Sequence, residues 1–297
     1  MIDRKKLYEW CSVPADKLQG NPNLKVPLRV VRDSAHMGEV MARDLVEEIK
    51  LANKEKRQIR AIIPCGPMAW YVPFARMINE ERVSMKNFIG LHMDECLDWQ
   101  GRLLDEDDPQ NFHSFMQKNF YGAIDEELRT PEEQRFYPTP DNLAFMHEKA
   151  MEAPVDITLG GWGQDGHVAY NQARRNPYSP LTLDQLRESV IRVQDNNWDT
   201  VVAIAQRNFG GGYQFVAPMS ITYGLKECFS AKKIRIFSDT GAWKQTALRV
   251  VLFGDEDPEY PFTLLHEHPD VIVTATEEVC RHPIAEHPEW KFRGINA

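Results

Sequence analysis

The residues best suited to chemistry are carboxylates and a histidine that follow apolar runs. Asp94 and Glu95 come directly after the apolar residues 88–93, and Asp165-Gly166-His167 follows a β-branched run that starts at Val155. A carboxylate can move a proton, and an imidazole can assist it at neutral pH. Adjacent carboxylates also occur in solvated loops, and a histidine after glycine is often structural. The combination nevertheless predicts a proton-transfer site.

Two cations add a second requirement to this site. Arg207 and Lys244 are each compatible with an ordinary solvated charge, but together they could hold an anionic group such as a phosphate. Gly66 and Gly161 follow apolar runs and would let the backbone come close to a ligand. A carboxylate, an imidazole and two cations are the groups that chemistry on a sugar phosphate requires.

These residues are placed by an alternation of strand and helix patterns. Apolar runs predict strands, and apolar residues at spacings of three and four predict helices between them. Strands are predicted within residues 24–31, 59–63, 88–93, 233–238 and 271–275, and from Val155 onwards; helices are predicted within 34–49, 68–77, 111–120, 143–151, 183–188 and 241–253, and residues 165–172 could also turn helical. The alternation predicts a doubly wound α/β fold with a mostly parallel sheet covered on both faces. Arg207 is expected at a strand end or a helix start, and an acidic loop at residues 97–110 could act as a lid.

Composition limits the classes of protein that remain. The 297 residues are long enough for one large domain, here residues 24–297, preceded by an N-terminal extension, residues 1–23. A net charge of -9 argues against a general nucleic-acid binder. The five cysteines form no metal-binding spacing, which favours reduced thiols and a cytoplasmic location. No apolar run reaches the ~20 residues of a membrane span. A homo-oligomer is compatible with the sequence.

At this point the sequence resembles the glucosamine-6-phosphate deaminase/isomerase family, with 6-phosphogluconolactonase as its wider relative. The resemblance is carried by several segments in the family's order: Met93-Asp94-Glu95, residues 112–116 with Asn119-Phe120, residues 160–171, Arg207-Asn208-Phe209, residues 218–224 and Gly241-Ala242-Trp243-Lys244. It covers roughly residues 25 to 280. The glycine-rich Asp-Gly-His segment is the most specific of these motifs.

The resemblance implies an aldose-ketose isomerisation in which an amino sugar 6-phosphate loses ammonia. It implies that Asp94 is the base that takes a proton from C2 and returns it at C1. It also implies that His167, oriented by Asp165, opens the sugar ring, and that Arg207 and Lys244 hold the phosphate. No metal or cofactor is expected.

The chain departs from the family's pattern at two places. Gln172 stands where the deaminases have a glutamate, and an amide can hydrogen-bond His167 but cannot accept its proton. Pro64-Cys65-Gly66-Pro67 replaces a longer, hydroxyl-bearing phosphate loop, and its prolines lack N–H donors. Cys65 is therefore a candidate site residue, although a buried structural thiol is the favoured alternative.

Two other functions stay open at this level. A sugar lactone hydrolase would use His167 to activate water, and the lack of a relay glutamate favours it. Against it, Cys96 follows Glu95 where the lactonases usually have arginine. A non-catalytic sugar-phosphate-binding homologue is the other alternative. The extension is too short and too weakly basic for the helix-turn-helix domain of a transcriptional regulator.

Overall fold

The centre of the molecule is a seven-stranded parallel sheet. The computed structural model describes residues 2–174, 176, 178–239 and 241–296. The strands follow one another across the sheet in the order β1 (Leu28–Val31), β10 (Val271–Thr276), β9 (Lys233–Ser238), β6 (Ile157–Gly161), β2 (Ile59–Ile63), β3 (Phe88–His92) and β5 (Arg135–Phe136). Every neighbouring pair is parallel. The predicted doubly wound α/β fold is confirmed.

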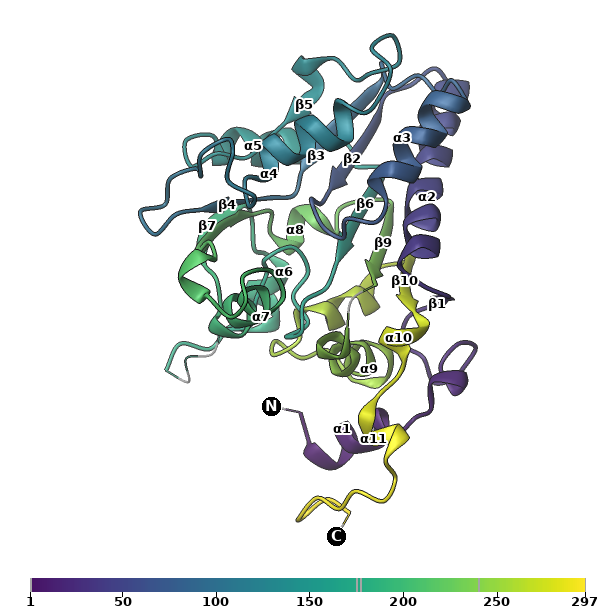
Figure 1. Ribbon diagram of the computed structural model, residues 1–297, viewed down its shortest axis with the longest axis vertical. Helices are drawn as coiled ribbons and strands as arrows, with labels where there is room; N and C mark the ends of the chain where they lie inside the picture. The colour runs from purple at the N-terminus through teal and green to yellow at the C-terminus, as the bar shows by residue number, and fades with distance from the viewer. Residues whose placement is uncertain (1, 175, 177, 240, 297) are drawn as a thin grey trace.

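Both faces of this sheet are buried. Along β2, Ala61 and Ile63 pack into a core cluster with the helices α2 (Ser34–Lys54) and α3 (Tyr71–Glu80), which lie side by side in Figure 1. Ile62, between them, packs into a different cluster with the helix α5 (Leu143–Met151). Successive side chains of a strand point to opposite faces, so the sheet needs a cover on each side. Continuous apolar strands are the expected result.

A smaller antiparallel sheet lies beside the main one and was not predicted. It consists of β4 (Asp94–Leu97), β8 (Met219–Thr222) and β7 (Arg192–Asp195). A single residue, Met93, separates the end of β3 from the start of β4, and Asp94 pairs with Thr222. The polar sequences of β4 and β7 gave no strand signal. This sheet holds Asp94 on a rigid element instead of a loop.

The other helices and turns are short. They are α1 (Arg4–Cys11), α4 (Phe112–Met116), α6 (Leu183–Arg187), α7 (Trp198–Asn208), α8 (Leu225–Cys228), α9 (Gln245–Phe253), α10 (Glu277–Cys280) and α11 (Pro283–Glu286), with a π-helical turn at Gln117–Tyr121 and 3-10 turns at Ala15–Lys17, Glu132–Gln134, Tyr213–Phe215, Ala242–Lys244 and Pro261–Glu267.

Three helix predictions need correction. The helix after β2 begins at Tyr71 and not at Met68, and α7 was not predicted at all. The helical turn expected after His167 does not form. Gly166 and Ala169 both have positive φ, and Val168 instead forms isolated β-bridges with Trp162 and Asn171. Positive φ interrupts a right-handed helix.

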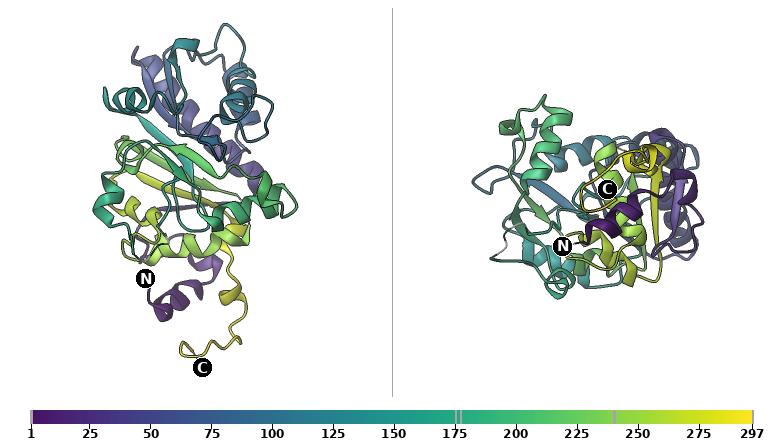
Figure 2. Two further views of the ribbon diagram at one scale, coloured as in Figure 1. Left: turned by 90° about the vertical axis from the view of Figure 1, so that its left-hand side faces the viewer. Right: turned by 90° about the horizontal axis from the view of Figure 1, so that it is seen from below.

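The segments near the two ends of the chain pack together at one end of the molecule, below the main sheet in Figure 1 and in the left view of Figure 2. The helix α1 contacts α9 and α11. The fully buried Arg249 of α9 donates hydrogen bonds to the carbonyl oxygens of Val13 and Cys280. The first 23 residues thus contact the body closely, and their separation as an extension stays a prediction.

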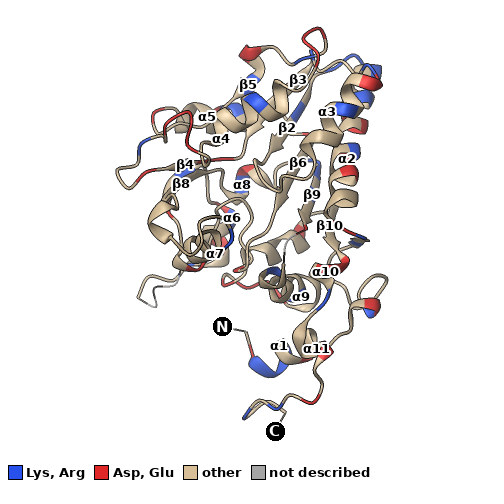
Figure 3. Cartoon of the chain, in the orientation of Figure 1, with Lys and Arg blue, Asp and Glu red and all other residues tan. Residues whose placement is uncertain are grey.

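The surface carries charges of both signs, with an acidic run, Asp105 to Asp108, on the loop after β4 (Figure 3). All five cysteines are buried as free thiols. None of the helices built from the described residues is both long and apolar enough to cross a membrane.

Candidate active site

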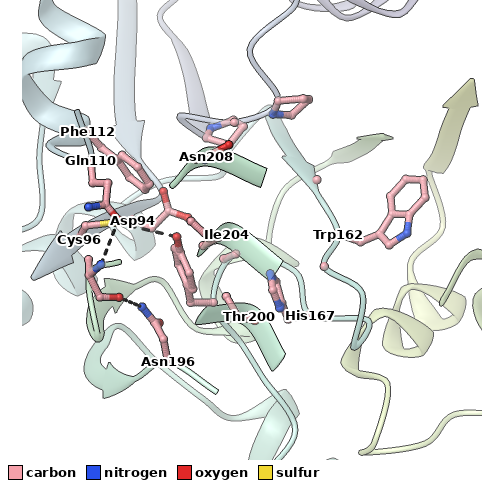
Figure 4. A pocket seen from close by; sticks show the side chains of 18 of the residues that line it. Asp94, Cys96, Gln110, Phe112, Trp162, His167, Asn196, Thr200, Ile204 and Asn208 are labelled. Carbon is pink, nitrogen blue, oxygen red and sulfur yellow. Dashed lines mark hydrogen bonds between the residues drawn. The ribbon is translucent and has the colours of Figure 1, made fainter. Parts of the chain in front are cut away.

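A cavity of about 420 Å³ lies beyond the carboxyl ends of β2, β3, β6 and β9. Its wall includes Asp94, Gly66, Gly161, His167, Arg207 and Lys244, all of them predicted site residues. Ligands of open α/β sheets bind at this edge of the sheet. One wall is formed by α7, whose Thr200, Ile204 and Asn208 face the cavity in Figure 4.

Asp94 is the first residue of β4 and points into the cavity (Figure 4). Its carboxylate receives no hydrogen bond from the described residues. Burial, followed by the negative charge of Glu95, raises the pKa of Asp94 to about 8. Its neighbours Cys96 and Tyr170 are neutral at pH 7, because burial raises the pKa of each well above its usual range. Asp94 is therefore a carboxylate with an unoccupied proton-accepting face and raised basicity.

His167 is paired with Asp165. The Nδ1 atom of His167 lies 2.6 Å from Oδ1 of Asp165, and the Asp165 side chain is fully buried. Burial alone would raise the pKa of Asp165, but the charge and hydrogen bond of His167 outweigh it and the pKa is lowered. An ionised Asp165 accepts the Nδ1 proton, which leaves Nε2 as the nitrogen that can exchange a proton with a ligand.

The glycine at position 163 makes room for this imidazole. A Cβ atom there would lie 2.1 Å from Cε1 of His167 and 2.4 Å from its Nδ1. These distances are far below van der Waals contact. The glycine-rich sequence before Asp165 thus serves the histidine directly.

Arg207 and Lys244 form the cationic part of the wall. Arg207 lies in the last turn of α7, which corrects its expected place at a strand end or helix start. Its guanidinium lies over the Trp243 ring at 5.0 Å, and the Lys244 ammonium lies 5.9 Å from the Trp162 ring. Burial lowers the pKa of both, and with the nearby charge of Arg207 it brings the pKa of Lys244 to about 8. Two cations that repel each other favour an anion between them.

Four predicted site residues do not line the cavity: Glu95, Cys65, Gln172 and Asp165, the last of which pairs with His167. Glu95 is buried, and its carboxylate accepts hydrogen bonds from the backbone N–H groups of Cys96, Phe112 and His113. It fixes the start of α4, so its predicted role as a substrate contact is not supported. Cys65 is also buried, and its carbonyl oxygen accepts a hydrogen bond from the Tyr71 hydroxyl. The structural alternative for Cys65 fits this position.

Gln172 is buried next to the histidine but does not line the cavity. Its Nε2 atom lies 3.5 Å from Nδ1 of His167 and 2.5 Å from Oγ1 of Thr200. Its Oε1 atom accepts a hydrogen bond of 2.8 Å from the backbone N–H of Asn197. Gln172 is thus close to the proton-transfer pair, while its hydrogen bonds go to the start of α7.

Several wall residues were not predicted as site residues: Gln110, Gln164, Tyr170, Asn196, Thr200, Ile204, Asn208 and Asp239. Asp239 follows the predicted strand 233–238 directly, so the rule that sites lie at strand ends could have found it. Thr200 and Asn196 had no such signal, because α7 was not recognised. Among the described residues, no group of three or more His, Cys, Asp or Glu side chains could hold a metal ion.

Comparison with known proteins identifies chains of similar fold. No family model matches the chain. The fold is shared with a monomeric glucosamine-6-phosphate deaminase, with a TM-score of 0.70 and 23% identity over 85% of this chain and 98% of that one. It is also shared with the 6-phosphogluconolactonase of Thermotoga maritima, with a TM-score of 0.58 and 14% identity over 84% and 98% of the two chains.

Proteins with similar sequences indicate which of these two groups the chain is related to. The glucosamine-6-phosphate deaminase of Parabacteroides distasonis is 29% identical over 241 residues, which cover 78% of this chain and 82% of the relative. That of Cronobacter sakazakii is 28% identical over 81% of this chain and 86% of the relative. The chain is a distant relative of the glucosamine-6-phosphate deaminases, and the resemblance predicted from its motifs is confirmed.

Proposed function

We propose that this protein is a sugar-phosphate isomerase/deaminase. Its substrate would be an amino sugar 6-phosphate, glucosamine 6-phosphate or galactosamine 6-phosphate, and its products a ketose phosphate and ammonia. The observation that carries the proposal is that the wall of one cavity brings together proton-transfer groups and cations. Asp94 and the His167–Asp165 pair can transfer protons, and Arg207 and Lys244 can hold a phosphate in the same cavity.

Ring opening is assigned to His167. Asp165 accepts a hydrogen bond from Nδ1, so Nε2, when it carries no proton, can take the proton of the anomeric hydroxyl and return one to the ring oxygen. The bond between C1 and the ring oxygen breaks, and the open-chain aldehyde forms. No net proton is consumed in this step.

The isomerisation is assigned to Asp94. Its carboxylate takes the proton from C2 while O1 gains a proton, which the substrate's own ammonium group can supply. The product of this step is an enol with an amino group on C2. Asp94 then returns its proton to C1, which leaves an iminium group at C2. Water adds to C2 and ammonia leaves. One carboxylate at one face of C1 and C2 serves both transfers.

The cavity wall near Gly66 and Pro67 differs from a phosphate-binding loop lined by hydroxyl groups. Gly66 and Pro67 form part of the wall, and neither carries a hydroxyl group. The phosphate would therefore depend on Arg207 and Lys244. Asp239, also in the wall, opposes them, since its charge favours the protonated form of Lys244 but repels an anion.

The proposed partner is a small-molecule sugar phosphate in the cytoplasm, without nucleic acid or membrane involvement. The net charge of -9 and the buried free thiols support this setting.

The experiment that tests the proposal is release of ammonia by the purified protein. Glucosamine 6-phosphate, galactosamine 6-phosphate and the unphosphorylated amino sugars should be compared, and ketose formation measured in parallel. Ammonia from a phosphorylated amino sugar supports the proposal. The absence of both ammonia and ketose from every substrate would refute it.

A sugar lactone hydrolase is the second candidate function. The fold shared with 6-phosphogluconolactonases and the amide at Gln172 favour it. In that reaction Nε2 of His167 would take a proton from water as it attacks the lactone carbonyl. A raised pKa on Asp94 has no evident use there, which favours the deaminase. Hydrolysis of 6-phosphogluconolactone, measured beside ammonia release, separates the two. The same wild-type protein, if it binds sugar phosphates but turns over none, is a binding homologue.

A further inference from the structure

Gln172 connects two parts of the site that are far apart in the sequence. It belongs to the segment that carries His167, and it is 6% exposed. Its amide oxygen accepts the backbone N–H of Asn197, and its amide nitrogen donates to Oγ1 of Thr200. Asn197 is the N-cap of α7 and Thr200 lies in its first turn. A second bond, from Nδ2 of Asn197 to the carbonyl oxygen of Ala173, joins the same two segments.

Gln172 does not hydrogen-bond the imidazole in this arrangement. Nδ1 of His167 already donates its proton to Asp165. The amide nitrogen of Gln172, 3.5 Å away, is also a donor, and the Asn197 N–H fixes the opposite end of the amide as the oxygen. Two donors cannot form a hydrogen bond with each other. Gln172 therefore flanks the ring and takes no part in proton transfer.

The helix α7 depends on this attachment. Its buried apolar residues Val201 and Ala205 form a small cluster with Val216, separate from the three larger core clusters. The far end of α7 carries Arg207 and Asn208, both in the cavity wall. A helix with little apolar packing of its own is placed mainly by its polar contacts. A shift at its first turn moves Arg207.

We propose that Gln172 is a positioning residue that docks the start of α7 against the His167 segment. One side chain then sets both the flank of the imidazole and the place of the anion-binding Arg207. Phosphate binding and the proton-transfer pair are in this way connected through a neutral amide. This docking by Gln172 is independent of the reaction catalysed, but the identity of the anion as a substrate phosphate rests on the proposed function.

The test compares Gln172→Leu with Gln172→Glu and uses inorganic phosphate as the probe. Leucine removes the acceptor of the Asn197 N–H, whereas glutamate keeps one. We expect Gln172→Leu to weaken phosphate binding, measured by calorimetry, about tenfold, the usual effect of an unpaired buried donor. Gln172→Glu should restore most of that loss. With substrate, the leucine variant should raise KM more than it lowers kcat.

Two further variants keep the test decisive. Gln214→Leu is the matched control, because Gln214 is exposed and forms no hydrogen bond within the described residues. Thr200→Val removes the partner of Nε2 and also changes one side chain of the cavity wall, and it should weaken phosphate binding by a smaller factor, about threefold. Near-ultraviolet circular dichroism checks that each variant is folded.

The proposal is overturned if a folded Gln172→Leu protein binds phosphate as tightly as wild type. If that variant does not fold, unchanged phosphate affinity in Thr200→Val overturns it. A wild-type protein that binds no phosphate also refutes it. Ammonia release is measured separately. If the wild type releases no ammonia but the wild type and the variants show the expected phosphate affinities, the proposed reaction is refuted and the docking role of Gln172 is supported.

Discussion

The replacement Gly163→Ala should inactivate the enzyme through a single added methyl group. The new Cβ atom would lie 2.1 to 2.5 Å from three atoms of the His167 ring. Carbon atoms in contact are about 3.5 Å apart, so the ring must move by more than roughly 1 Å. That movement breaks the 2.6 Å contact with Asp165. A displacement of this size costs about a hundredfold in rate.

The assay measures kcat for ammonia release by Gly163→Ala, together with phosphate affinity. We expect kcat to fall by about a hundredfold while phosphate binding stays at the wild-type level, because Arg207 and Lys244 are not displaced. The control is the same substitution in a His167→Ala background. If the methyl group acts only through the ring, it should cost nothing further there. Retention of kcat within threefold in the single variant would refute this reasoning.

The remaining predictions concern charge. Lys244→Gln should weaken phosphate binding by about tenfold or more, and the exposed Lys226→Gln is its control. In the wild type, KM should increase when the pH exceeds about 8, the pKa of Lys244. Glu95→Gln should move the acid limb of kcat/KM below the Asp94 pKa of about 8, since the charge of Glu95 contributes to raising it; an unmoved limb contradicts the assignment of Asp94. Asp94→Asn should raise the melting temperature. The pKa of Asp94 is raised from 3.8 to about 8 in the folded protein, so the free energy of unfolding falls as the pH rises through that interval. Asparagine does not titrate and avoids this loss. The gain should therefore grow from about pH 4 to pH 8 and then level off, and a gain independent of pH would contradict it.

Six of the seven strands of the main sheet could be predicted because they have a strong local signal, whereas the two-residue strand β5 was expected to be a loop. Ile59–Ile63 and Phe88–His92 are short, apolar and bounded by polar or proline-containing segments, and both are buried throughout. Once the strands are placed, the parallel topology brings their carboxyl ends to one edge. Asp94 and His167 could therefore be expected to meet, although 73 residues separate them.

The antiparallel sheet could not be predicted from local pattern, since tertiary contacts stabilise its polar strands. The strand β7, Arg192–Asp195, has a single apolar residue, and its strand conformation depends on pairing with β8. The helix α7 is different, because Val201, Ile204 and Ala205 recur at helical spacing and the sequence did carry a signal for this helix. The partners of Gln172 lie at the start of α7 and were not predicted because this helix was not.

The role of Glu95 shows another limit of sequence reasoning. A carboxylate after a strand can serve a ligand or cap a helix, and the sequence is the same in both cases. Glu95 accepts the first N–H groups of α4, which begins 17 residues later. Only the fold shows which of the two adjacent carboxylates can contact a ligand, because Asp94 faces the cavity and Glu95 does not.

The most direct test of the proposed chemistry is ammonia release from glucosamine 6-phosphate by wild type and Asp94→Asn at pH 8. Wild type should release ammonia and form the ketose phosphate. Loss of the base should lower turnover by about a thousandfold, while binding of the sugar phosphate, followed by thermal shift, persists. An Asp94→Asn protein with full turnover, or a wild-type protein that releases no ammonia, would contradict the proposal.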